Sequence, residues 1–143
     1  MIVVDAMVLN YALINHPHFS DEVEELRDID SAWVGPPLWR SEQRNTLMQY
    51  VRASDPRIPR TDIDLDEAQS YMEDAEGWMG TLNVRSSDVL RLASESDCTA
   101  YDCEYVALAQ HLGVWLVTYD DEVLEAFPNT ALHPSEFLSM HGN

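Results

Sequence analysis

The stretch that decides the fold is residues 99–120, which read Thr99-Ala-Tyr-Asp102-Cys-Glu-Tyr105-Val-Ala-Leu-Ala109-Gln-His-Leu112-Gly113-Val-Trp115-Leu-Val-Thr118-Tyr-Asp120. Its first part predicts a helix that begins at Thr99 or Ala100 and ends at Leu112, and Gly113 is a typical residue after a helix end. The apolar residues 115–118 then predict a buried strand. A helix that leads into a buried strand is the repeating unit of a parallel α/β sheet.

The rest of the chain shows the same alternation of short apolar runs and helical patterns. Strands are predicted at residues 2–4 and 32–34 and around Leu132. Helices are predicted at residues 8–14, 19–28, 38–53, 65–82 and 87–95, with a last helical turn that begins at Pro134. We therefore predict an α/β fold. It is a single domain of residues 1–143, with a parallel sheet of about five strands flanked by helices on both faces.

The composition limits the class of protein. The chain has 143 residues, of which 45% are hydrophobic, so wholesale disorder is not expected. No apolar run approaches the roughly 18 residues that a membrane span needs. The start, Met1-Ile-Val-Val-Asp5, predicts a first strand and not a signal peptide, so a cytoplasmic protein with no membrane partner is expected. Cys98 and Cys103 match no zinc motif and are expected in or near the core.

The charge is strongly negative. Eight Lys and Arg against 26 Asp and Glu give a formal net charge of −18, and every base is Arg. This balance argues against ordinary non-specific nucleic-acid binding and fits either a chain adapted to high salt or one with a basic partner. Five of the bases nevertheless lie close together in one stretch: Arg40, Arg44, Arg52, Arg57 and Arg60. That stretch is the candidate surface for a phosphate backbone, while pairing on a helix surface explains it equally well.

Four acids are placed by the expected sheet. Asp5 ends the first strand, Asp120 follows the strand of residues 115–118, and Asp102 lies in the first turn of the helix before that strand. Ligand sites of doubly wound sheets lie at the carboxyl ends of strands where the strand order reverses, so Asp5 and Asp120 converge if their strands are neighbours there. Glu42 lies in the helix after the second strand, with Asn45 on the same side.

Carboxylates brought together without Lys need a cation to neutralise them, and a hard divalent ion such as Mg²⁺ is the economical choice. Each acid also has a local explanation. Asp102 could interact with the helix dipole, Asp120 could belong to a turn, and Glu42 could pair with Arg40 or Arg44. Asp5 is the hardest to explain in this way, because an acid that closes an apolar strand is costly to bury without a partner.

Four segments in this order carry a family resemblance: residues 3–9, 37–47, 99–109 and 116–120. Together they resemble the PIN-domain ribonucleases, and within that superfamily the VapC-type toxins of toxin–antitoxin pairs. The resemblance implies that Asp5, Glu42, Asp102 and Asp120 are catalytic ligands of Mg²⁺ or Mn²⁺. It also implies metal-dependent cleavage of RNA, a homodimer and a cognate antitoxin.

The resemblance extends to nearby residues. Asn45 and Thr118 match supporting positions, and Asp121 adds an acid that is either a further support or a turn residue. Arg40, Arg44 and Arg52 are the candidate RNA contacts. Met7 departs from the family, which often has a small hydroxyl or amide residue there, so one hydrogen bond that supports the metal site is missing.

Four alternatives to a toxin nuclease differ in the residues that they require. A PIN nuclease of housekeeping RNA processing fits the same residues, and a catalytically silent RNA- or protein-binding module is expected to lack one of the four acids. A phosphorylated receiver domain needs a Lys that the chain does not have, and a phosphatase of the Asp-x-Asp type needs an acid in place of Met7. Of the other residues, His16 is expected at the surface, and Trp39 is the tryptophan with a possible base-stacking role.

Overall fold

Five short strands form one sheet in the order β3-β2-β1-β4-β5, and every neighbouring pair is parallel. The structure is a computed structural model that describes residues 1–52 and 63–142. The strands are β1 (Ile2–Val4), β2 (Trp33–Gly35), β3 (Gly80–Thr81), β4 (Leu116–Val117) and β5 (Ala131–Leu132). The helices are α1 (Ala6–Leu13), α2 (Ser20–Ile29), α3 (Leu38–Arg52), α4 (Leu65–Trp78), α5 (Ser86–Ser94), α6 (Ala100–Leu112), α7 (Asp121–Ala126) and α8 (Pro134–His141). The predicted α/β class and parallel sheet are confirmed.

The strand order reverses beside β1. The chain goes from β1 to β2 and β3 on one side, and then returns to place β4 and β5 on the other side. In the pairing of β1 with β4, Val3 lies opposite Leu116 and Val4 opposite Val117. The strands that precede Asp5 and Asp120 are therefore neighbours at the switch point, which is the condition under which the two acids were expected to converge.

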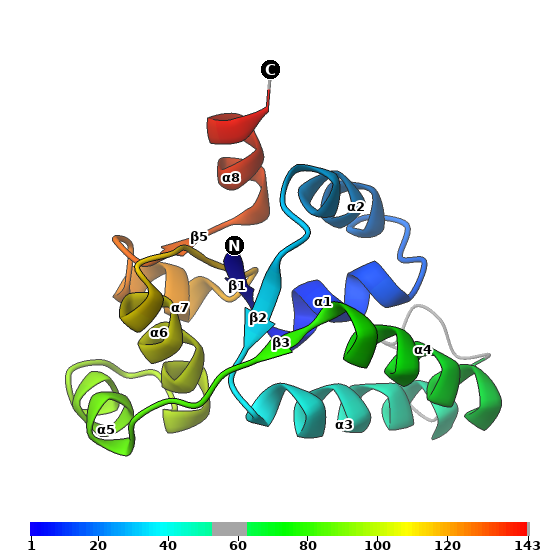
Figure 1. Cartoon of the computed structure of the whole chain (residues 1–143), viewed down its shortest axis with the longest axis horizontal. Coiled ribbons are helices and arrows are strands. Elements are labelled where there is room, and N and C mark those ends of the chain that lie inside the picture. The colour runs from blue at the N-terminus through cyan, green and yellow to red at the C-terminus, as the bar shows by residue number, and fades with distance from the viewer. Residues whose placement is uncertain (53–62, 143) are drawn as a thin grey trace.

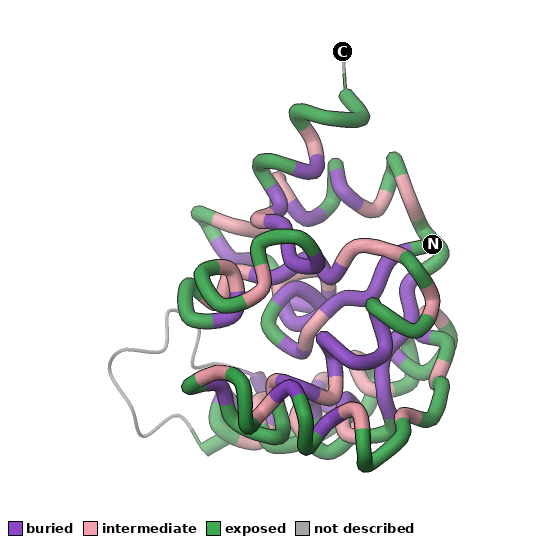
Figure 2. The backbone as a smooth tube through the Cα atoms, turned by 90° about the vertical axis from the view of Figure 1, so that its left-hand side faces the viewer, coloured by how far each residue is buried: buried purple, intermediate pink, exposed green. Residues whose placement is uncertain are grey.

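Apolar side chains fill both sides of the sheet. Figure 1 shows α5 and α6 on one side and α1, α3 and α4 on the other, while α2 and α8 pack together at one end. All residues of β1 and β4 are buried, and Figure 2 shows the buried backbone concentrated in the interior. α6 reaches β4 through Gly113, which has φ +66°, a left-handed conformation that favours glycine at a helix end.

Two parts of the chain differ from the sequence prediction by more than one or two residues at an element end. The helix predicted for residues 65–82 ends at Trp78, and Gly80–Thr81 pairs with β2 instead. Met79 is buried, and it lies at a position that fits the apolar spacing of α4. The spacing of apolar residues therefore could not show that the helix ends at Trp78. Gly80 suits the new strand, since a Cβ atom there would lie 3.0 Å from Cγ1 of Val34. The other difference is α7, which begins at Asp121 where a turn was favoured.

Two side chains are more buried than the sequence predicted. His16 is buried, not at the surface, because its ring packs on Tyr11 and Phe19, and its Nδ1 accepts a hydrogen bond from the His18 amide. Trp39 is fully buried and donates its indole N–H to Oγ1 of Thr81 at 2.9 Å, so it is not available for base stacking.

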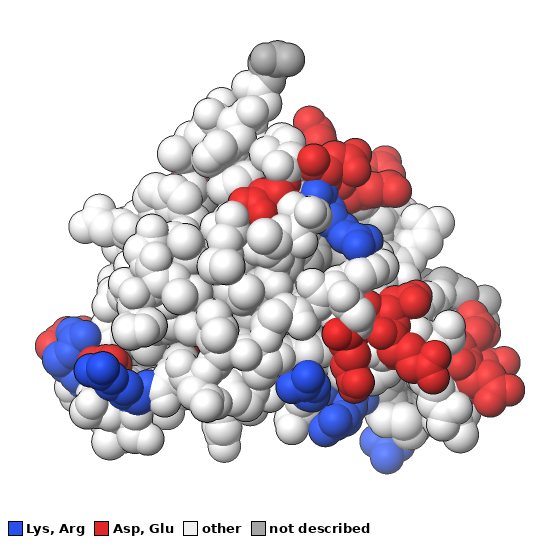
Figure 3. Space-filling view, in the orientation of Figure 1, with Lys and Arg blue, Asp and Glu red and all other residues white. Residues whose placement is uncertain are grey.

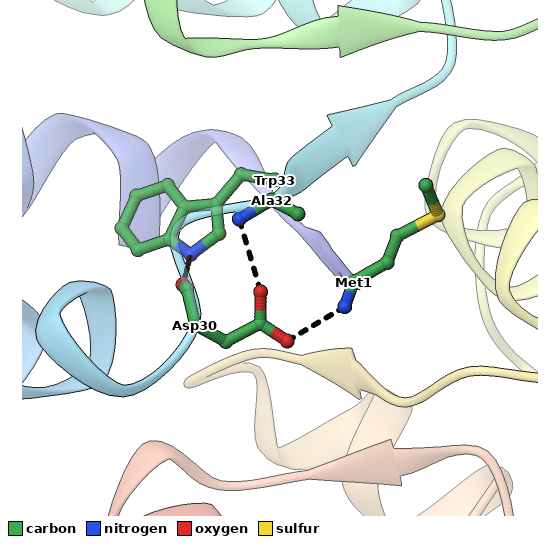
Figure 4. A network of polar contacts seen from close by, with 4 residues as sticks. All are labelled: Met1, Asp30, Ala32 and Trp33. Carbon is green, nitrogen blue, oxygen red and sulfur yellow. Dashed lines mark hydrogen bonds and ion pairs between the residues drawn. The ribbon is translucent and has the colours of Figure 1, made fainter.

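The first strand is anchored at its start by an ion pair (Figure 4). The amino group of Met1 lies 2.7 Å from Oδ2 of Asp30, and Oδ1 of the same carboxylate accepts the amide hydrogen of Ala32 at 3.0 Å. The indole N–H of Trp33 donates to the Asp30 carbonyl. These contacts join the starts of β1 and β2. Among the described residues, no helix is long and apolar enough to cross a membrane.

A buried polar ladder joins α1 to α3. Nε2 of Gln43 donates to Oδ1 of Asn10, and Nδ2 of Asn10 donates to the Tyr50 hydroxyl, each at 3.2 Å. Asn10 and Gln43 are both fully buried. The ladder fixes α3, which carries Glu42, against the helix that follows Asp5.

The Asn10→Ala variant should lose about 2–4 kcal/mol of unfolding free energy, because it leaves the Gln43 amide and the Tyr50 hydroxyl buried without partners. Urea denaturation at equilibrium measures this loss. The matched control is Asn45→Ala on the exposed side of α3, which should change stability by no more than about 0.5 kcal/mol. Equal effects of the two substitutions would show that the ladder does not stabilise the fold.

Candidate functional site

A pocket of about 360 Å³ opens at the carboxyl ends of β1 and β4. The four predicted acids, Asp5, Glu42, Asp102 and Asp120, all line it. Its other lining residues are Ala6, Met7, Tyr11, Tyr105, Leu116, Thr118, Tyr119 and Val123. The fold thus brings into one pocket acids that are far apart in the sequence.

Asp5 and Asp120 are each held by the helix that follows their strand. Oδ1 of Asp5 accepts the amide hydrogen of Val8 at 3.0 Å and caps α1. Oδ1 of Asp120 accepts the amide hydrogens of Glu122 at 2.9 Å and Val123 at 3.3 Å, and caps α7. The first amides of a helix have no partner within the helix, and the positive end of the helix dipole favours a carboxylate there. The same contacts that begin the two helices therefore fix both carboxylates.

Thr118 connects these two acids. Its hydroxyl donates a hydrogen bond to Oδ2 of Asp5 and accepts the amide hydrogen of Asp120 at 3.0 Å. Thr118 is 1% exposed, so its hydroxyl has little access to water. This threonine, predicted as a supporting residue, lies between the ends of β1 and β4 and couples their positions.

Glu42 and Asp102 come from helices on the two sides of the sheet. The Tyr105 hydroxyl of α6 donates to Oε1 of Glu42 on α3 at 2.5 Å. Among the described residues, neither Arg40 nor Arg44 pairs with Glu42, so the alternative explanation of Glu42 by a local ion pair does not apply. Tyr105 was not among the residues predicted for the site. Its spacing of three residues from Asp102 on one helix was the available signal, because residues three apart share a helix face.

The pocket raises the pKa values of Asp5 and Glu42. Burial is the main cause that raises the pKa of Asp5 to about 6, and the charges of Glu42 and Asp120 add to it. Hydrogen bonds from Thr118 and Val8 act in the opposite direction. Burial and the charge of Asp102 also raise the pKa of Glu42. No Arg of the described residues lines the pocket, and the chain has no Lys. The carboxylates therefore repel one another with no side-chain cation to compensate.

The donors of this pocket match a hard divalent cation in their chemistry. Asp and Glu oxygens are the ligands that Mg²⁺ and Mn²⁺ prefer, and the described part of the pocket wall contains no thiol or imidazole, although Met7 contributes a thioether. However, no three or more His, Cys, Asp or Glu side chains within residues 1–52 and 63–142 are arranged to hold a metal ion as they stand. The donor types fit the ion, and the side chains are not gathered around one point.

The other predicted site residues lie outside this pocket. Asn45 and Asp121 are exposed and do not line it. Arg44 and Arg52 are exposed on α3, while Arg40 is half-buried, with its guanidinium carbon 5.1 Å from the Trp39 ring centroid. Arg57 and Arg60 lie outside the described residues. On the face in Figure 3, basic groups lie along the edge occupied by α3 and over α5, and acidic groups cover α2 and α4.

The Asp5→Asn variant should be more stable than the wild type in metal-free buffer with EDTA. As pH rises from about 4 to about 6, the unfolded chain releases the Asp5 proton before the folded chain does, so wild-type stability falls in this window. Asn keeps the helix cap without the charge. Above pH 6 the variant should be favoured by about 1–3 kcal/mol, and the difference should vanish near pH 4. Urea unfolding across this range measures it, and a more stable wild type at pH 7 would contradict the account.

Comparisons with known proteins agree with this architecture. No protein-family model matches the chain. The chain is 30% identical over 114 residues to ribonuclease VapC3 of Pyrobaculum aerophilum, and the match covers 75% of each sequence.

Solved structures have the same fold. PAE2754 of Pyrobaculum aerophilum superposes with a TM-score of 0.70 at 24% identity, covering 97% of this chain and 94% of that one. A toxin–antitoxin complex from Klebsiella pneumoniae superposes with a TM-score of 0.69 at 14% identity, covering 94% of this chain and 98% of that one. FitAcB of Neisseria gonorrhoeae superposes with a TM-score of 0.66 at 14% identity, covering 94% of this chain and 99% of that one. The structural matches show the shared fold, and the identity to VapC3 over three quarters of both sequences shows the family: the chain belongs to the VapC family of PIN-domain proteins.

Proposed function

We propose that the protein is a metal-dependent endoribonuclease that hydrolyses RNA phosphodiester bonds, with Asp5, Glu42, Asp102 and Asp120 holding Mg²⁺ or Mn²⁺. The observation that carries the proposal is the convergence of these four acids on one pocket whose described wall contains no basic side chain. The raised pKa of Asp5 is the electrostatic sign of that arrangement. The name of the relative in Pyrobaculum, a ribonuclease, supports RNA as the substrate.

The chain's own residues prepare the pocket for this chemistry. Thr118 and the first amides of α1 and α7 hold Asp5 and Asp120, while Tyr105 holds Glu42. When bound, the divalent cation would supply a more acidic water and stabilise charge on the phosphate and leaving oxygens. Its positive charge would also let an anionic phosphate approach the carboxylates. The carboxylates would bind and orient the cation, and the reaction needs no nucleophilic side chain.

RNA outside the pocket would follow the basic edge of α3. Arg44 and Arg52 are exposed there, and Arg40 lies on the same helix. Guanidinium groups are suited to phosphate contacts, so we propose these three as RNA-binding residues. Residues 1–143 would act as one nuclease domain in the cytoplasm, where the substrate is found.

We further propose that the protein is the toxin of a toxin–antitoxin pair and that it forms a homodimer. Membership of the VapC family and the fold shared with the Klebsiella toxin–antitoxin complex support an antitoxin partner. A strongly negative chain also suits a basic partner. The alternative role is housekeeping RNA processing, which would use the same pocket without an antitoxin.

Wild-type protein should cleave single-stranded RNA in Mg²⁺ or Mn²⁺ but not in EDTA. The Asp5→Asn variant should lose at least about 100-fold of this activity, because it removes a charged ligand from the centre of the pocket. The control is Asp121→Asn, an exposed neighbouring acid that does not line the pocket and should keep nearly full activity. Gel analysis of labelled RNAs at low and high salt measures the rates.

Three other results of these experiments would change the proposed function in different ways. Cleavage that persists in EDTA would overturn the metal-dependent mechanism. If the wild type binds Mn²⁺ in calorimetry but cuts none of the RNAs, its target is narrower than those RNAs. If it neither binds Mn²⁺ nor cuts RNA, a catalytically silent RNA- or protein-binding module would be the better function.

The homodimer predicts a mass in solution of twice the 16.3 kDa of the chain. Size-exclusion chromatography with light scattering gives this value directly. The measurement should be made at low and at molar KCl, because screening of the −18 charge favours association. A mass of one chain at both salt concentrations would contradict the dimer.

A further inference from the structure

Two tyrosines share the pocket with the four acids. Tyr11, from α1, and Tyr119, between Thr118 and Asp120, both line it, and both are half-buried. Neither hydroxyl bonds to a pocket carboxylate among the described residues. Both residues therefore line the pocket without being needed to hold the acids.

The ring of Tyr119 is held in one orientation. Its hydroxyl donates to Oε1 of Glu22 at 2.7 Å. Its ring makes edge contacts with Phe19 and His133, each at a centroid distance of 5.0 Å, and with Tyr11 at 5.6 Å. Burial and the hydrogen bond to Glu22 raise its pKa, so the phenol stays neutral. Tyr119 is thus a fixed, uncharged aromatic surface beside a charged pocket.

Tyr11 extends this surface. Its ring stacks on Phe19 with a centroid distance of 4.6 Å and an interplanar angle of 20°. Phe19 therefore supports Tyr11 from behind as it contacts Tyr119. Rings braced in this way lose little conformational entropy when a planar ligand packs on them.

The chemistry of a nucleotide fits a wall of this kind. Its phosphate needs a cation, which the carboxylates would hold, whereas its base is uncharged and aromatic. In a pocket without basic side chains in its described wall, a base can be bound by stacking, which does not depend on charge and tolerates every base. The volume of about 360 Å³ lies within the range of small-ligand pockets, roughly 300–1,000 Å³.

We propose that Tyr119 and Tyr11 form a base-stacking subsite for the nucleotide next to the phosphate bound at Asp5, Glu42, Asp102 and Asp120. This inference rests on the proposed nuclease function. It gives the protein a source of substrate affinity that is independent of its few arginines. It also predicts that affinity depends on the presence of a base and little on which base is present.

The test compares mononucleotides with ribose 5-phosphate, which lacks the base, by calorimetry in Mn²⁺. The wild type should bind AMP and UMP at least about 10-fold more tightly than ribose 5-phosphate. In Tyr119→Leu this advantage should fall below about 3-fold, with the affinity for ribose 5-phosphate unchanged. Tyr119→Phe, which keeps the ring, should retain it. Tyr101→Leu is the matched control, because Tyr101 is 64% exposed and does not line this pocket.

Three results would overturn the subsite: equal binding of AMP and ribose 5-phosphate by the wild type, no binding of either, or an equal loss of both in Tyr119→Leu. The last would mean that Tyr119 only positions Asp120. A Mn²⁺ titration without nucleotide separates this failure from failure of the proposed function. If the protein binds Mn²⁺ but binds AMP no more tightly than ribose 5-phosphate, the stacking subsite is rejected and the proposed nuclease function is not. If it binds AMP more tightly than ribose 5-phosphate but neither binds Mn²⁺ nor cleaves RNA, the stacking subsite is supported and the nuclease function is rejected.

Discussion

The parallel pairing of β1 with β4 is the constraint on which the candidate site depends. The pairing of Val4 with Val117 places Asp5 beside Thr118, and the Thr118 hydroxyl bonds to Asp5 while it accepts the amide of Asp120. A shift of one residue in this register would turn the side chains of a strand to the opposite face of the sheet. The apolar residues of both strands oppose such a shift, because they are buried between the helices on the two sides.

The carboxyl ends of β1 and β4 also bring like charges close together. Four carboxylates line one pocket, and Asp5, Glu42 and Asp120 are held by neutral donors from two helix ends, one threonine and one tyrosine. The hydrogen bonds from Thr118 and Val8 lower the pKa of Asp5 but do not offset its burial, so this pKa still rises to about 6. The fold thus buries a group whose charged form is disfavoured by burial. Such perturbed groups cluster at functional sites. A braced wall of tyrosine rings adds an uncharged surface to the same pocket.

Much of this arrangement could be predicted from local sequence. Apolar runs at residues 2–4 and 115–118 indicated the central strands, and Asp5 and Asp120 were identified because they follow those strands. β3 was missed, since Met79 is apolar at a spacing that also suits α4. Tyr105 and Tyr119 were given no role because their importance depends on partners, Glu42 and Glu22, which lie 63 and 97 residues away in sequence. Trp39 was misjudged for the same reason, since Thr81 provides its buried partner.

The long separation of Asp5 and Thr118, 113 residues, also has a consequence for synthesis of the protein. A ribosome makes β1 long before β4, so Asp5 and Glu42 emerge well before Thr118 and Asp120. A growing chain without β4 has no partner strand on that side of β1 and cannot close the pocket. If the pocket cleaves RNA, a growing chain cannot form the complete site before β4 and Asp120 have left the ribosome.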